Sequence, residues 1–195
     1  MNRDSLQAYG DLANDIQEIF ATEQEIHNRV SAIGAAISRD YAGKDVVLIG
    51  VLKGVLCFMA DLVRTITIPV EVDFISISGY SAKEPFHGVV RFVKDVEVPV
   101  ENRHIIFVED VVDTGLTLNY LLRNLRARNP ASLEVCTLFN KPDRRLIEAR
   151  IKYTGFDLPD FFVVGYGLDH RERYRNLPFV GILKPGALLN KRGPK

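Results

Sequence analysis

The stretch His104-Ile-Ile-Phe-Val-Glu-Asp-Val-Val-Asp-Thr-Gly-Leu-Thr-Leu118 decides the fold of this chain. It contains a run of four apolar residues, 105–108, which predicts a parallel strand covered on both faces. The run ends in two adjacent carboxylates, Glu109 and Asp110, and a third, Asp113, precedes the start of a helical pattern. We therefore expect a buried strand, a tight turn and then a helix.

The turn from Asp113 to Thr117 has the features of an anion site. Backbone N–H groups and the helix dipole favour a negatively charged ligand at the N-terminus of a helix. Glu109 and Asp110 would repel a bare phosphate group at this place. A suitable ligand would also bring hydroxyl groups for the acids and a divalent cation that offsets charge. A phosphorylated sugar with Mg²⁺ meets that description.

The rest of the chain alternates between strand and helix patterns. Apolar and β-branched runs predict strands, and they lie at 46–51, 70–78, 133–139, 161–166 and 179–183. A capping box at Thr22 and Glu25 starts a helix that ends before Gly43. Further helices are predicted over 55–65 and 116–128. This alternation predicts the α/β class, with a largely parallel sheet flanked by helices and ligands bound beyond the carboxyl ends of its strands.

Residues 79–92 lack clear periodicity. They contain Gly, Ser, Pro and charges of both signs. We expect a long loop here, and long loops in compact domains often serve as lids.

Composition excludes several classes of protein. The chain has 25 basic and 25 acidic residues, and this balance argues against nucleic acid as an obligate partner. A net charge of zero also gives little electrostatic repulsion between copies of the chain, so we expect a homodimer or homotetramer. No apolar run approaches the roughly 20 residues of a membrane span, and the N-terminus has no signal-peptide core. Cys57 and Cys136 lie in apolar contexts and predict free, buried thiols in the cytoplasm.

The segment 108–118 resembles the signature by which phosphoribosyltransferases bind 5-phosphoribosyl 1-pyrophosphate (PRPP). Other segments are similar to the hypoxanthine/guanine branch and occur in the family's order over most of residues 22–185. They are Gly50-Val-Leu-Lys-Gly54, Phe139-Asn-Lys-Pro142, Phe161-Phe-Val-Val-Gly-Tyr-Gly-Leu-Asp169 and Tyr174-Arg-Asn-Leu-Pro178. The resemblance implies one domain, 1–195, with the type I phosphoribosyltransferase fold. Its core would cover about 22–145, and residues 1–20 with segments after 145 would form a small hood over the base.

The resemblance implies that Glu109 and Asp110 accept hydrogen bonds from the ribose hydroxyls, directly or through Mg²⁺. The 5′-phosphate would lie in a cradle made by Asp113, Thr114, Gly115, Leu116 and Thr117. Some relatives carry Lys where this chain has Leu116, so the cradle here would depend more on backbone donors. Asp113 would also be the base that takes the purine N7 proton. A structural role for Asp113 at the start of the helix is the alternative.

The resemblance also implies a pyrophosphate site. The turn Leu52-Lys53-Gly54 would bind pyrophosphate through backbone N–H groups, and relatives often have a non-proline cis peptide between the residues at positions 52 and 53. Arg175 would hold the leaving pyrophosphate, and Asp169 would help to hold Mg²⁺ close to it. Without the resemblance, these residues read as a common turn after a strand and as a solvated charged face.

The base would be a 6-oxopurine. The resemblance sets Lys141 against its exocyclic O6, which would select hypoxanthine or guanine because an ammonium donor would face the amino donor of adenine. Phe162 would stack on the ring, and the Val163 backbone, with Asp169 nearby, would meet its Watson–Crick edge. The alternative for Lys141 is a solvated lysine in a polar turn. The alternative for Phe162 and Val163 is that both are core residues of a strand.

The lid is one place where the chain departs from the family. Relatives often have Ser-Tyr at its start, whereas this chain has Ser78-Gly79-Tyr80. Tyr80 is retained as a predicted lid contact, but the adjacent hydroxyl is lost.

The sequence therefore predicts a cytoplasmic, Mg²⁺-dependent enzyme that makes IMP or GMP from PRPP and hypoxanthine or guanine. A homologue that prefers xanthine or guanine is the nearest alternative. A non-catalytic regulator that senses PRPP and binds nucleic acid is the alternative from another class. Such a regulator should have a basic face or an added domain. This chain shows neither, and it retains Asp113, Lys141 and Arg175.

Overall fold

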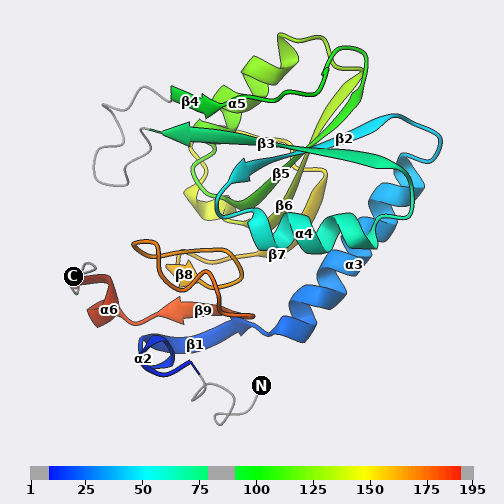
Figure 1. The fold of residues 1–195 in the computed structure, drawn as a ribbon. Helices are drawn as coiled ribbons and strands as arrows, with labels where there is room; N and C mark the ends of the chain where they lie inside the picture. The colour runs from blue at the N-terminus through cyan, green and yellow to red at the C-terminus, as the bar shows by residue number, and fades with distance from the viewer. Residues whose placement is uncertain (1–8, 79–90, 190–195) are drawn as a thin grey trace.

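Two sheets organise the chain. The computed structural model describes residues 9–78 and 91–189. Within them, a larger six-stranded sheet has the order β4-β3-β2-β5-β6-β7, and a smaller sheet has the order β1-β9-β8 (Figure 1). The strands are β1 (Ile16–Ala21), β2 (Val46–Leu52), β3 (Val70–Ser78), β4 (Arg91–Lys94), β5 (His104–Val112), β6 (Ser132–Asn140), β7 (Tyr153–Asp157), β8 (Val163–Val164) and β9 (Val180–Leu183). The helices are α2 (Asp11–Asn14), α3 (Glu23–Asp40), α4 (Leu56–Thr65), α5 (Leu116–Arg126), the 3₁₀ turn η1 (Pro142–Arg144) and α6 (Pro185–Leu189).

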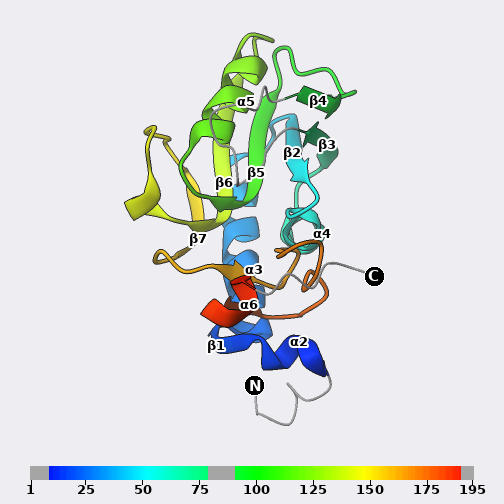
Figure 2. The same ribbon diagram turned by 90° about the vertical axis from the view of Figure 1, so that its left-hand side faces the viewer.

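The larger sheet is parallel from β3 to β7, with β4 antiparallel at its edge. Helices cover both faces, with α3 and α4 on one and α5 on the other (Figure 2). Alternate residues of β5 explain this arrangement. Ile106 and Val108 pack in the cluster with α3 and α4, whereas Ile105 and Phe107 pack in the cluster with α5. The prediction that residues 105–108 form a strand buried on both faces is confirmed.

Most predicted elements are confirmed, including the capping box that starts α3 at Thr22. Three differences concern short strands. Arg91 and Phe92, predicted to be loop, belong to the edge strand β4. The strand expected over 161–166 is reduced to β8. Strand β7 was not predicted, because it is short and contains Gly155, where a Cβ atom would lie 2.4 Å from the carbonyl oxygen of Leu138.

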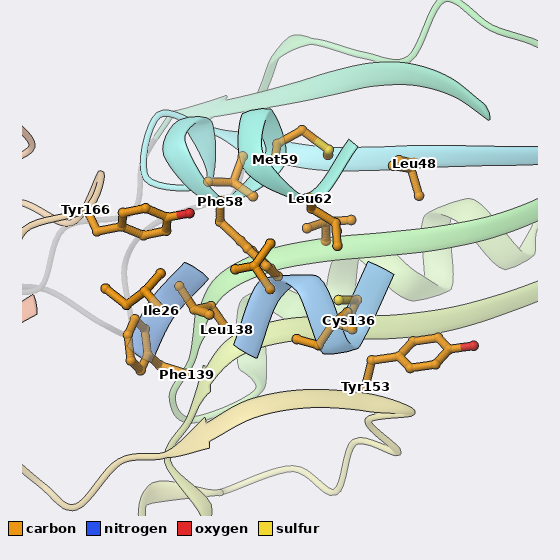
Figure 3. Close-up of a cluster of buried hydrophobic side chains, with 14 of the residues drawn as sticks. Ile26, Leu48, Phe58, Met59, Leu62, Cys136, Leu138, Phe139, Tyr153 and Tyr166 are labelled. Carbon is orange, nitrogen blue, oxygen red and sulfur yellow. The ribbon is translucent and has the colours of Figure 1, made fainter. Parts of the chain in front are cut away.

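The smaller sheet joins the two ends of the chain, since β1 pairs antiparallel with β9, and β9 pairs with β8. We call β1, β8, β9 and the loops between β7 and β9 the hood. Its Tyr166 lies in the same apolar cluster as Phe58 of α4 (Figure 3). The Tyr166 hydroxyl donates to Asp61 Oδ2 at 2.6 Å. Strand β7 lies beyond residue 145, where we expected the hood to begin, yet it belongs to the larger sheet.

The predicted lid residues Gly79 and Tyr80 lie outside the described residues. Across 9–78 and 91–189, each helix is too short or too polar to cross a bilayer.

A buried carboxylate on β3 holds the edge of the larger sheet. Asp73 Oδ1 accepts from Lys94 Nζ at 2.9 Å, and its Oδ2 accepts from the backbone N–H groups of Glu97 and Val98 at 2.6 and 3.2 Å. Burial alone would raise the pKa of Asp73. The hydrogen bonds from Lys94 and from the N–H groups of Glu97, Phe74 and Val98 outweigh burial and lower it to about 2. The ionised carboxylate therefore ties β4 and the segment after it to β3.

Replacing this carboxylate should destabilise the protein. A pKa of about 2 in place of 3.8 corresponds to about 2 kcal/mol, which is present above pH 3.8 and lost as the pH falls towards 2. Asp73→Asn should therefore lower the free energy of unfolding in urea at pH 7 by about 2 kcal/mol. The control is Asp95→Asn, which breaks an exposed pair with Arg128 and should cost less than about 1 kcal/mol. Equal losses in the two variants would contradict this account of β3.

Candidate active site

A cavity of about 590 Å³ opens at the carboxyl ends of β2, β3, β5 and β6, facing the hood. This volume is in the range of cavities that bind small molecules. The place follows from the topology, because parallel strands present their carboxyl ends at one edge of a sheet. Its lining residues are Val51, Leu52, Lys53, Gly54, Ser76, Ile77, Glu109, Asp110, Val111, Val112, Asp113, Thr114, Gly115, Thr117, Leu118, Lys141, Phe162, Val163, Leu168, Asp169, Glu172 and Arg175.

The predicted site residues come together in this one cavity. Within the described residues, the exception is Leu116, whose side chain is 39% exposed at the start of α5 and does not line the cavity. The structure adds lining residues that the sequence did not suggest, among them Ser76, Ile77 and Glu172. Ser76 and Ile77 end the parallel strand β3, so the strand-end rule could have found them. Glu172 had no signal beyond its place in a charged run.

The turn after β2 lies against the acid pair in the carboxyl-terminal part of β5. Gly50 pairs with Val108, so the two strands end side by side. A Cβ atom on Gly54 would lie 1.7 Å from Asp110 Oδ2, so only glycine leaves room for this carboxylate. The peptide bond between Leu52 and Lys53 is cis, as the family resemblance implied.

The carboxyl groups of Glu109 and Asp110 are largely buried from solvent. Glu109 is 9% exposed. Burial and the negative charge of Asp110 raise the pKa of Glu109 well above its usual range. Burial also raises the pKa of Asp110 to about 6, although backbone N–H groups and the charge of Arg175 act in the opposite direction. Hydroxyl donors or a cation from a ligand would favour the ionised form of both side chains.

The turn before α5 is held from behind by a second segment. The N-cap of α5 is Gly115, in the left-handed region with φ 81°, and no side chain caps the helix. The carbonyl oxygen of Thr114 accepts from the N–H groups of Leu146 and Ile147 at 2.9 and 3.2 Å. The alternative role for Asp113, as the cap of this helix, is therefore wrong. Its side chain remains available for other contacts.

Asp113 forms an ion pair that the sequence did not indicate. Arg144 Nε donates to Asp113 Oδ1 at 2.9 Å, and Arg144 Nη1 lies 3.2 Å from both carboxylate oxygens of Asp160. These hydrogen bonds raise the pKa of the Arg144 guanidinium. The pair leaves Oδ2 of Asp113 without a contact from Arg144.

Lys141 is buried, so its alternative as a solvated lysine is wrong. Its side chain is 9% exposed, and Nζ donates to the carbonyl oxygen of Phe161 at 2.7 Å. Burial lowers the pKa of Lys141, although Asp113 and Asp160 act to raise it. An ammonium group in this setting can give a second hydrogen bond to a ligand carbonyl.

Phe162 and Val163 differ in exposure although they are neighbours. Phe162 is 44% exposed and lines the cavity, with its ring 5.3 Å from that of His170 in an edge contact. It is therefore not a core residue, and it can present an aromatic face to a ligand. Val163 is 8% exposed and belongs to β8. Its side chain is in the core, as the alternative stated, which leaves the backbone for contact with a ligand.

Two cations and two acids meet at the end of the cavity near Gly54. Arg175 Nη2 lies 2.8 Å from Asp169 Oδ1 and 3.3 Å from Glu172 Oε2. Lys53 Nζ lies 3.1 Å from the same oxygen of Glu172. Arg175 Nη1 donates to the carbonyl oxygen of Gly167 at 2.8 Å, which fixes the guanidinium beside the turn of Gly54.

The residues fit a divalent cation such as Mg²⁺. Within the described parts of the chain, no three acidic, His or Cys side chains form a metal site by themselves. Mg²⁺ is more often held by one or two carboxylates together with substrate oxygens and water. Glu109, Asp110 and Asp169 line the cavity and have carboxylate oxygens of the kind that Mg²⁺ prefers. Burial raises the pKa values of both Glu109 and Asp110, so a cation bound beside them would favour their ionised forms.

Known proteins share both the sequence pattern and the fold. A model of the phosphoribosyl transferase domain matches residues 17–171. The chain belongs to the phosphoribosyltransferase family. The hypoxanthine-guanine phosphoribosyltransferase of Mycobacterium tuberculosis is 46% identical over 177 residues, which cover 88% of each chain. That of Streptococcus pneumoniae is 43% identical over 179 residues, covering 92% of this chain and 99% of the relative.

Solved structures of the family agree with this fold. A hypoxanthine phosphoribosyltransferase from Staphylococcus aureus superposes with a TM-score of 0.89 at 41% identity, covering 93% of this chain and 98% of that chain. A mutant of the Trypanosoma cruzi enzyme, in a ternary complex with substrates, gives a TM-score of 0.83 at 37% identity, covering 89% and 98%. The prediction of a type I phosphoribosyltransferase fold from the hypoxanthine/guanine branch is confirmed.

The contact between Gly54 and Asp110 can be tested in this phosphoribosyltransferase. Gly54→Ala should displace the Asp110 carboxylate and weaken the binding of PRPP, the ligand that the sequence predicts, by about 10- to 100-fold, as for a lost charged hydrogen bond. Isothermal titration with PRPP and Mg²⁺ measures the effect. Gly186→Ala is the control, because a Cβ atom there would meet nothing within 4 Å. Equal PRPP affinity in the two variants would show that Asp110 is not constrained by Gly54.

Proposed function

We propose that this protein is a purine-salvage enzyme that transfers the 5-phosphoribosyl group of PRPP to hypoxanthine and/or guanine. The products are IMP and/or GMP, and pyrophosphate. One observation carries the proposal. A single cavity contains an acid pair, a helix N-terminal turn, a buried lysine beside an exposed aromatic ring, and an arginine–lysine pair. Membership of the phosphoribosyltransferase family and 46% identity to a hypoxanthine-guanine phosphoribosyltransferase support it.

The PRPP half of the cavity would be built around β5. The carboxylates of Glu109 and Asp110 would accept hydrogen bonds from the ribose 2′- and 3′-hydroxyls, which would favour their ionised forms despite burial. The 5′-phosphate would bind at the start of α5, at backbone N–H groups and the Thr114 and Thr117 hydroxyls. Gly115 supports this role because its left-handed conformation turns the backbone into the helix at this place.

The pyrophosphate group would lie between the turn of Leu52, Lys53 and Gly54 and the guanidinium of Arg175. Both line the same end of the cavity. Backbone N–H groups and two cationic side chains are suited to an anion with several charged oxygens. They would stabilise the negative charge that develops as pyrophosphate leaves.

The purine half would be formed by Lys141, Phe162 and Val163. Lys141 Nζ already donates one hydrogen bond, to the carbonyl oxygen of Phe161, and it would donate another to O6 of the purine. Phe162 would stack on the purine ring, and the backbone of Val163 would meet its Watson–Crick edge. Adenine would leave Lys141 and its own amino group facing each other as two donors, which disfavours it.

The reaction would proceed by bond breaking ahead of attack. The bond between C1′ and the pyrophosphate oxygen breaks, and its electron pair leaves with pyrophosphate. N9 of the purine then forms the new bond to C1′, and the N7 proton moves to the carboxylate of Asp113. Asp113 Oδ1 accepts from Arg144, so Oδ2 is the oxygen suited to take the proton. Positioned bases of this kind contribute about 10²–10⁴-fold to the rate.

Mg²⁺ would be held by Glu109, Asp110 and Asp169 together with oxygens of PRPP. It supplies positive charge that makes pyrophosphate a better leaving group. The protein's own part would be to orient Arg175 through the carbonyl oxygen of Gly167 and the carboxylate of Asp169.

The proposal includes the cytoplasm as the compartment, and the free thiols of Cys57 and Cys136 support it. No nucleic acid or membrane takes part in the proposed reaction. A homodimer or homotetramer stays a prediction.

Nucleotide formation from four bases tests the function directly. With PRPP and Mg²⁺, hypoxanthine or guanine should give IMP or GMP at least about 100-fold faster than adenine gives AMP, because adenine leaves polar groups unpaired. Chromatography of the products, with xanthine as the fourth base, measures this. PRPP binding without any product would favour the regulator, and adenine as the best substrate would contradict the role of Lys141.

Loss of the base at position 113 should affect catalysis more than binding. Asp113→Asn should reduce kcat by about 10²–10⁴-fold, because an amide cannot take the N7 proton. The Kd of PRPP should change by only a few-fold. The control is Asp143→Asn, an exposed acid of η1, which should keep normal turnover. Near-normal kcat in Asp113→Asn would refute the assignment of the base.

A further inference from the structure

The carboxylate of Glu172 lies between the two cations that the proposed function assigns to pyrophosphate. Lys53 Nζ donates to Glu172 Oε2 at 3.1 Å, and Arg175 Nη2 approaches the same oxygen to 3.3 Å. All three side chains line the cavity. One carboxylate oxygen therefore occupies the position between Lys53 and Arg175 that suits an oxygen of a phosphate group.

A tight turn in the hood holds Glu172 at this position. Arg171 and Glu172 both have left-handed backbone conformations, with φ 56° and 62°. His170 and Arg173 exchange backbone hydrogen bonds at 3.2 Å across the turn. The N–H of Glu172 also donates to Asp169 Oδ2 at 2.8 Å. These contacts fix the backbone of Glu172, so the approach of its side chain to Lys53, 119 residues away in sequence, follows from the fold.

The contact of Glu172 can be exchanged for a ligand. The side chains of Lys53 and Glu172 are 66% and 64% exposed, and exposed ion pairs contribute little to stability. Arg175 keeps a second carboxylate partner, Asp169 at 2.8 Å, and it would stay oriented when Glu172 moves away.

We infer that Glu172 is an internal competitor of pyrophosphate: its carboxylate pairs with Lys53 and Arg175 when the pyrophosphate subsite is empty and is displaced when pyrophosphate binds. The inference rests on the proposed function, which puts pyrophosphate at these two cations. Binding of pyrophosphate, free or as part of PRPP, must first break two ion pairs. After displacement, the negative charge of Glu172 stays close to the ligand. Both effects weaken the binding of pyrophosphate and speed its release.

The role of Glu172 is therefore to set the affinity for pyrophosphate, and its side chain takes no part in making or breaking covalent bonds. Glutamine has the same shape as glutamate but no charge. It would free Lys53 and Arg175 and would remove the repulsion, while the turn that its backbone forms would remain. A residue with a merely structural role would, on substitution, weaken binding or leave it unchanged. Tighter binding is the distinctive result.

Isothermal titration of the full chain with inorganic pyrophosphate, with and without Mg²⁺, tests the inference. Glu172→Gln should bind pyrophosphate about 3- to 10-fold more tightly than the wild type, as expected for one or two exposed ion pairs removed. The gain should shrink at high salt, because screening weakens exposed charge interactions. The control is Glu101→Gln, which removes one negative charge in an exposed turn just before β5, at the other end of that strand from the acid pair, and should not change the affinity.

Steady-state kinetics gives a second readout on the same variants. In Glu172→Gln, the KM for PRPP and the inhibition constant of product pyrophosphate should both fall by about the same 3- to 10-fold. Binding of pyrophosphate by the wild type, with equal or weaker binding by Glu172→Gln, would overturn the competitor role and leave the proposed function intact. Failure of both proteins to bind pyrophosphate and PRPP would overturn the proposed function itself and the competitor role with it.

Discussion

The parallel register of β2 and β5 is the constraint on which the site depends. Because Gly50 pairs with Val108, the two strands end at the same edge of the sheet, and the turn that follows β2 meets the carboxyl-terminal part of β5. The backbone at Gly54 then lies against the Asp110 carboxylate, with no room for a Cβ atom between them. A slip of one residue would turn the side chains of one strand to the opposite face and would separate the acids from the turn. The core that buries both strands therefore also aligns the chemistry.

The cavity contains charges that the fold does not neutralise. Burial raises the pKa of Asp110 from 3.8 to about 6, so ionising it in the ligand-free protein costs stability. The sign follows from the direction of the shift, since stability falls as the pH rises from about 4 through about 6. The buried Lys141 has the opposite charge, and desolvation lowers its pKa, so keeping it protonated also costs stability. The low local dielectric that imposes these costs also strengthens each contact with a ligand of matching charge.

The long strands and helices were predictable because their apolar periodicity coincides with burial, as in β3, predicted and found at Val70–Ser78. Short elements were not predictable. Phe162 shows why, because an apolar residue can be exposed in a cavity instead of extending a strand. The site residues came from the resemblance of consecutive motifs, which lie at the strand ends. The pairs of Asp113 with Arg144 and of Lys53 with Glu172 could not be read from sequence. They join residues 31 and 119 positions apart and depend on turns that have no periodicity.

The hood needs both ends of the chain. Its central pairing joins β1 near the N-terminus to β9 near the C-terminus, with Ile16 opposite Leu183. During synthesis, the strands that carry the acid pair and the turn before α5 leave the ribosome well before β9 does. Chains fold as they emerge, and contacts between distant residues close late. The side of the cavity formed by Phe162 and Val163 of β8 can therefore be completed only after β9 has been synthesised. A chain that stopped before residue 180 would lack β9, the strand that joins β1 to β8, so the complete hood forms only in a chain that extends through β9.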